Sequence, residues 1–129
     1  MMERETLLLL ARDAAQHAHC PYSHFRVGAA VVANEQIYTG VNIEISSYGL
    51  TLCAERSAIA AAISAGATPI THIAIACIDA PENASTGERT PCGACRQWLA
   101  DLAPDAIISL DKVAQDFRVP DLIPHAFNL

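Results

Sequence analysis

The spacing of apolar residues divides the chain into segments of helical and of extended character. From Glu3 to His17 apolar residues recur three and four positions apart, which predicts an amphipathic helix. The Cys20-Pro21 pair ends this pattern. The run from Phe25 to Ala33 is almost wholly apolar and predicts a buried strand, and Asn34-Glu35 forms a turn into a second strand from Gln36 to Ile43. We expect these two strands to form a hairpin.

Helices and strands continue to alternate along the rest of the chain. Strong helix formers from Leu52 to Ala65 predict a second helix, and Gly66 stands where a C-terminal cap belongs. The β-branched run from Ile70 to Ile78 predicts a strand. Thr90-Pro91 resembles an N-cap followed by proline at the first helical position, and it predicts a third helix from Cys92 to about Leu102.

The C-terminal part of the pattern is shorter. Ala106 to Leu110 predicts a fourth strand, and the tail from Phe117 to Leu129 contains two prolines, so it can hold at most a short helix. Strands that alternate with helices in this way predict an α/β sandwich.

Composition limits the class of protein. The chain has 129 residues, of which 52% are apolar and 17% charged, as expected of one globular domain spanning residues 1–129. Its apolar runs are too short to cross a membrane, and its N-terminus is acidic where a secretory signal would be basic, so we expect a cytoplasmic protein. The net charge of −6 leaves no basic stripe for a nucleic acid polymer.

Cysteine supplies the candidate chemistry. Five cysteines in a reducing compartment favour metal binding or catalysis over disulfides. Cys53 opens the predicted second helix, and Cys92 and Cys95 form a Cys-x-x-Cys pair at the start of the third. Thiolates are preferred ligands of zinc, so these three predict a site for one Zn²⁺ per subunit. Three protein ligands leave the fourth position open, as in a catalytic zinc site that activates water.

The residues around these cysteines fit such a site. Helix N-termini favour thiolates, and Arg56 and Arg96 are placed to donate hydrogen bonds to the sulfurs, Arg56 being the better candidate. Glu55 is the candidate proton carrier, although two positions after Cys53 in a regular helix it would face away from the metal. That conflict disappears if Cys53 precedes the first helical turn.

Other interpretations of the cysteines remain open. A Cys-x-x-Cys pair also occurs in structural zinc sites, which need four protein ligands. The five histidines show no paired spacing with the cysteines that would supply the fourth. Cys20 and Cys77 are interpreted as small buried apolar residues, and Trp98 as a core or interface residue.

The two cysteine motifs, Cys53-Ala54-Glu55-Arg56 and Pro91-Cys92-Gly93-Ala94-Cys95-Arg96-Gln97, resemble the zinc signature of the cytidine deaminase superfamily. Further segments resemble the small nucleoside cytidine deaminases. They are Tyr22 to Ala29, Asn42-Ile43-Glu44, Ser47 to Thr51 and Leu122 to Phe127. The resemblance implies a three-layer α/β/α sandwich with a mixed central sheet.

It also implies roles for individual residues. Asn42 and Glu44 would hydrogen-bond the ribose, Phe25 would lie against the pyrimidine, and backbone N–H groups near Ala54 and Cys92 would orient the base. Tyr48 and Phe127 would complete the pocket of a neighbouring subunit, since family members of this length are usually homotetramers with shared active sites.

The implied reaction is the hydrolytic deamination of cytidine and 2′-deoxycytidine to the corresponding uridines and ammonia, as in pyrimidine salvage. Glu55 would take a proton from water, protonate N3 and pass a proton to the departing ammonia. The family pattern commonly reads Asn-Val-Glu-Asn-Ala-Ser-Tyr-Gly, whereas this chain carries Ile45 and Ser46 in that stretch. A deaminase of another aminopyrimidine nucleoside, such as blasticidin S, and a non-catalytic zinc-stabilised interaction domain are the alternatives.

Overall fold

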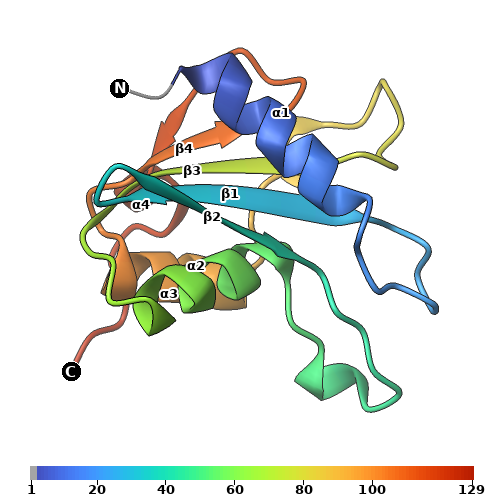
Figure 1. Ribbon diagram of the computed structural model, residues 1–129, viewed down its shortest axis with the longest axis horizontal. Helices are drawn as coiled ribbons and strands as arrows, with labels where there is room; N and C mark the ends of the chain where they lie inside the picture. The colour runs from blue at the N-terminus through green and yellow to red at the C-terminus, as the bar shows by residue number, and fades with distance from the viewer. Residues whose placement is uncertain (1–2) are drawn as a thin grey trace.

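The computed structural model describes residues 3–129, which build one mixed sheet with helices on both faces (Figure 1). The strands run in the spatial order β2-β1-β3-β4-β5, and β3 and β4 form the parallel pair while the other neighbours are antiparallel. The bounds of the strands are β1 Val27–Ala33, β2 Gln36–Val41, β3 Ile70–Cys77, β4 Ile107–Leu110 and β5 Phe117–Arg118. Those of the helices are α1 Arg4–Ala15, α2 Ala54–Ser64, α3 Gly93–Leu102 and α4 Val119–Leu122, with short 3₁₀ turns at Tyr48–Leu50 and Thr86–Glu88.

Two layers of apolar packing hold the helices to the sheet. Successive side chains of a strand point to opposite faces, so along β1 Ala29 and Val31 join the core under α2 and α3, whereas Ala30 joins the core under α1. Both faces of β1 and β3 are therefore covered, which is why their sequences are continuously apolar rather than alternating. The predicted α/β/α sandwich with a mixed sheet is confirmed. No helix in residues 3–129 has both the length and the apolar character that a bilayer crossing requires.

The predicted elements exist, and their ends differ in ways that matter for the site. The strand expected from Phe25 begins at Val27, and the strand expected to reach Ile43 ends at Val41. The prediction that Thr90-Pro91 opens the third helix is wrong. Cys92 is the N-cap with extended backbone angles (φ −68°, ψ 172°), and the helix begins at Gly93. The short helix α4 lies in the tail, where the prolines prevent a longer helix.

Two glycines let helices lie directly against the sheet. A Cβ at Gly28 would lie 2.0 Å from the backbone oxygen of Ala11 in α1, and a Cβ at Gly40 would lie 2.3 Å from the backbone nitrogen of Ala58 in α2. Neither neighbour can move without displacing a helix. Gly40 therefore sets the depth at which α2, with Cys53 at its N-cap, packs on β2.

We predict that Gly40→Ala lowers the free energy of unfolding by at least about 2 kcal/mol, because the new methyl group overpacks the contact between β2 and α2. Urea unfolding measures the effect. Gly87→Ala is the matched control, since its Cβ would meet only the Ser85 side chain at 3.8 Å, and it should change stability by less than about 0.5 kcal/mol. Equal stability of the two variants would contradict this account of the packing.

Candidate active site

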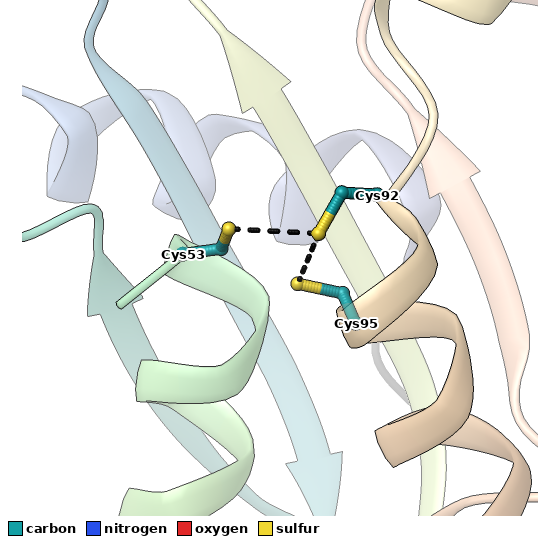
Figure 2. A group of neighbouring side chains, drawn as sticks. All are labelled: Cys53, Cys92 and Cys95. Atoms are coloured by element: carbon teal, nitrogen blue, oxygen red, sulfur yellow. Dashed lines mark hydrogen bonds between the residues drawn. The ribbon is translucent and has the colours of Figure 1, made fainter. Parts of the chain in front are cut away.

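Three sulfur atoms converge where the N-termini of α2 and α3 meet (Figure 2). Cys53 and Cys92 are the N-caps of these helices, and Cys95 lies in the first turn of α3. The Sγ atoms of Cys53 and Cys92 are 3.7 Å apart, those of Cys92 and Cys95 are 3.5 Å apart, and all three lie within 4.8 Å of one another. The predicted trio is thus assembled from two separate helices.

This spacing fits a zinc ion. Tetrahedral Zn–S bonds of about 2.3 Å place neighbouring sulfurs about 3.8 Å apart, close to the two distances above. Among residues 3–129, no fourth His, Cys, Asp or Glu joins the group. The site therefore has the three protein ligands of a catalytic zinc centre rather than the four of a structural one.

The pKa values of the cysteine thiols also indicate a cation site. A hydrogen bond from Cys95 lowers the pKa of Cys53 to about 5, with a further contribution from Arg56. The same hydrogen bond, together with burial, raises the pKa of Cys95. One thiol ionises easily and its neighbour resists, because like charges this close repel. A divalent cation removes that conflict by stabilising all three thiolates.

Arg56 lies beside the sulfurs and Arg96 does not. One Nη atom of Arg56 donates to Cys53 Sγ at 3.3 Å, and the contact raises the pKa of the guanidinium. The expectation for Arg96 has to be corrected. Its hydrogen bonds go to the Pro91 and Leu122 carbonyls and to the Thr90 hydroxyl, so among the described residues it joins α3 to the tail instead of contacting a sulfur.

Glu55 is a buried carboxylate next to this cluster. Because Cys53 is a non-helical N-cap (φ −75°, ψ 156°), Glu55 falls in the first turn of α2, and the conflict with regular helical spacing does not arise. Glu55 is 5% exposed, and burial raises the pKa of its carboxyl group to about 7, with the Cys53 charge acting in the same direction. A carboxyl group with this pKa can both accept and release a proton near neutral pH.

A short stretch of backbone pairing brings the predicted ribose-binding residues to the same place. Ile43 exchanges two hydrogen bonds with Leu52, the residue before Cys53. Asn42 and Glu44 flank Ile43, so their side chains share the face opposite to that of Ile43. Glu44 lies on a cavity of about 300 Å³ whose other lining residues are Tyr22, Ser23, Tyr48 and Thr51.

The remaining predicted contacts differ in exposure. Phe25 is half-buried and Ala54 is fully buried at the start of α2. Tyr48 and Phe127 are 66% and 68% exposed. The backbone oxygen of Phe127 accepts a hydrogen bond from Gln97 Nε2 at 2.9 Å, which holds the tail against α3.

Some residues around the site had no predicted role. Ser23 donates its hydroxyl to Glu44, and the Thr51 carbonyl accepts a hydrogen bond from Arg56 at 3.3 Å. Ser23 and Thr51 lie in segments that resemble the family, but the resemblance assigns no role to the Ser23 hydroxyl or to the Thr51 carbonyl. Cys20 and Cys77, expected to be buried, are only half-buried.

Comparison with known proteins gives a consistent result. The model of the cytidine and deoxycytidylate deaminase zinc-binding region matches residues 1–110. A probable cytidine deaminase of Dictyostelium discoideum is 39% identical over 129 residues, covering 98% of this chain and 84% of that protein. A cytidine deaminase of Mycobacterium tuberculosis is 39% identical over 120 residues, covering 92% of this chain and 85% of its own length.

Solved structures show the same similarity. The cytidine deaminase of Burkholderia pseudomallei superposes with a TM-score of 0.86 at 37% identity, covering 98% of this chain and all of that one. The Mycobacterium tuberculosis structure superposes with a TM-score of 0.84 at 35% identity, with complete coverage of both chains.

Proposed function

We propose that the site described above carries out the hydrolytic deamination of cytidine, because the chain belongs to the cytidine and deoxycytidylate deaminase family. Water replaces the exocyclic amino group at C4 of cytosine, and uridine and ammonia are the products. The observation that carries this function is a three-sulfur metal group with a buried carboxylate beside it, in a chain of the family's fold.

Cys53, Cys92 and Cys95 would hold the zinc ion. Bound zinc supplies Lewis acidity that brings the pKa of a water molecule toward neutrality. Arg56 offsets part of the negative charge of the three thiolates through its hydrogen bond to Cys53.

Glu55 moves the protons of the reaction. Its carboxylate accepts a proton from the attacking water and delivers it to N3 of the ring. It then takes the second proton from the hydroxyl group formed at C4 and passes it to the amino group, which leaves as ammonia as the C4–N bond breaks. The pKa of about 7 that burial produces suits a group that must act as base and then as acid. The free N–H groups at the starts of α2 and α3, near Ala54 and Cys92, would orient the base because the first turn of a helix leaves its N–H groups without intrahelical acceptors.

Phe25, Asn42 and Glu44 would bind the nucleoside. Phe25 lies against the pyrimidine ring, and the side chains of Asn42 and Glu44 form hydrogen bonds with the ribose hydroxyls. The Asn42 amide already bonds Val27 N and Phe25 O, which leaves it one N–H and one lone pair for the sugar. The 2′-deoxy sugar keeps most of these contacts, so deoxycytidine is included among the proposed substrates.

Tyr48 and Phe127 support a shared site. Both are large apolar side chains that lie mostly in solvent, and Tyr22 packs edge-on against Tyr48 with ring centroids 5.4 Å apart. Tyr48 lines the cavity described above, whereas Phe127 lies in the tail next to α3, and large apolar side chains exposed in this way are available to an interaction partner. We propose a homotetramer in which these two residues complete a neighbour's pocket, with residues 1–129 acting as one catalytic domain. The free thiols of the metal group fit a reducing compartment such as the cytoplasm.

Sedimentation equilibrium tests the assembly. We expect the mass of four chains for the wild type, and for Phe127→Ala a KM for cytidine raised by about tenfold, because a contact to bound substrate is lost. A monomer with full activity would exclude the shared pocket.

A panel of substrates tests the reaction. Turnover of cytidine and deoxycytidine should exceed that of free cytosine by about 100-fold or more in kcat/KM, since the base alone leaves the sugar-binding polar groups unpaired. Blasticidin S is the comparison for the alternative antibiotic deaminase. If cytidine is the poorest of the four, the proposed substrate is wrong.

Substitution of Glu55 tests the proton carrier separately from the metal. Glu55→Gln should retain one zinc per chain and lose turnover by about 1,000-fold or more, the range associated with removal of a general acid and base. Cys92→Ser should lose zinc and turnover together, and Cys20→Ser should keep both. Zinc content by mass spectrometry and ammonia release are the measurements. Normal turnover in the Glu55 variant would remove this residue from the mechanism.

A further inference from the structure

The segment from Tyr22 to Arg26 carries Phe25 and has no regular secondary structure, yet its backbone is held at several points. One carboxylate oxygen of Glu44 accepts hydrogen bonds from Tyr22 N at 3.2 Å and Ser23 N at 3.0 Å. The Ser23 hydroxyl in turn accepts from Phe25 N at 3.0 Å. These contacts fix the segment on the side where Tyr22 and Ser23 line the cavity of about 300 Å³.

Asp79 holds the same segment from the other side. Its Oδ2 accepts hydrogen bonds from Arg26 N at 2.8 Å and Arg26 Nε at 2.9 Å, and its Oδ1 accepts from Arg26 Nη2 at 2.8 Å. Ile78 N donates to Arg26 O at 3.2 Å. The residues that follow β3 therefore bind both backbone polar groups of Arg26, and they continue the pairing of β1 with β3 beyond the last strand residues.

The alternation of side chains explains how this contact reaches Phe25. Val27 packs with the core under α2 and α3, so in extended backbone Phe25 points to that same face and Arg26 to the opposite one. Consistent with this, Arg26 Nη1 donates at 3.3 Å to Gln16, the C-cap of α1. Asp79 thus fixes the backbone next to Phe25, although Asp79 itself contacts the Arg26 side chain on the α1 side of the sheet.

The contact between Asp79 and Arg26 persists over the working pH range. Arg26 lowers the pKa of Asp79 to about 2, so the carboxylate stays ionised at neutral pH. A planar guanidinium paired with both carboxylate oxygens also fixes orientation more strongly than a single bond would.

We propose that Asp79 is a positioning residue for the nucleoside site. It binds both the backbone N–H and the guanidinium of Arg26, and this fixes the backbone beside Phe25 so that the Phe25 ring faces the pyrimidine. The proposal rests on the role given above to Phe25. It goes beyond the metal group and the sugar contacts, because Asp79 contacts neither the cavity lining nor a sulfur among the described interactions.

Asp79→Asn is the first test. The asparagine keeps the size of the side chain but turns an N–H₂ group toward the guanidinium, so one side of the pairing is lost. We expect KM for cytidine to rise about tenfold, with kcat and zinc content changed by less than about twofold, because a base contact made equally in the ground and transition states affects binding alone. Asp116→Asn is the matched control. It breaks another arginine–carboxylate pair of 2.8 Å, with Arg4, and should leave KM unchanged.

A double-mutant cycle with Phe25→Leu shows whether Asp79 acts through Phe25. If it does, Asp79→Asn raises KM in the wild type and has little further effect in the Phe25→Leu background. Arg26→Lys, which keeps the charge and loses the bidentate geometry, should give an intermediate KM. A KM effect that is undiminished without the ring, or a D79N variant with wild-type KM, overturns the positioning proposal. Wild-type KM in Phe25→Leu itself would instead show that the proposed contact of Phe25 with the base is wrong.

Discussion

The site depends on one electrostatic constraint: three sulfur atoms from two helices lie so close together that their thiolate forms repel one another unless a cation binds them. Two of the three separations are 3.7 and 3.5 Å, and the trio lies at helix N-termini where backbone N–H groups favour anions. Arg56 brings a single positive charge to these sulfurs and donates a hydrogen bond to Cys53. Much of the surrounding structure, including the close contact of α2 with β2 at Gly40, keeps these sulfurs together for a metal ion to bind.

Polar side chains extend the sheet into the site where regular strands end. β1 begins at Val27 and β2 ends at Val41, yet Asn42, Glu44 and Asp79 continue to bind the backbone beyond those ends. Irregular backbone held by specific side chains can adopt a shape that a strand cannot, because each side chain can supply an acceptor where the ladder has none. The segment from Tyr22 to Val27 is shaped in this way. The 43–52 segment, which projects beyond the N-terminus of α2 (Figure 1), is instead closed by backbone hydrogen bonds between Ile43 and Leu52.

The residues of the metal group could be predicted because their chemistry is local. A Cys-x-x-Cys pair at a helix start and Cys53 at another have few interpretations, and the structure brings all three together. Arg96 shows the limit of that reasoning. Its position next to Cys95 suggested a contact with sulfur, but the guanidinium is taken up by carbonyls from Pro91 and Leu122, and the latter lies in a segment that only folding brings near.

The sequence by itself determined the order of helices and strands as far as β4, the three cysteines of the metal group, Glu55 as the candidate proton carrier and the family, since each depends on residue type and short-range spacing. It did not predict β5, a two-residue strand at the start of the tail. Only the tertiary structure decided that Cys53 and Cys92 are N-caps in extended backbone, that Arg56 and not Arg96 contacts a sulfur, and that Asp79 holds the residue beside Phe25. These features join segments far apart in the chain. Their partners are selected by packing and by competition among hydrogen-bond acceptors, and no local pattern encodes that competition.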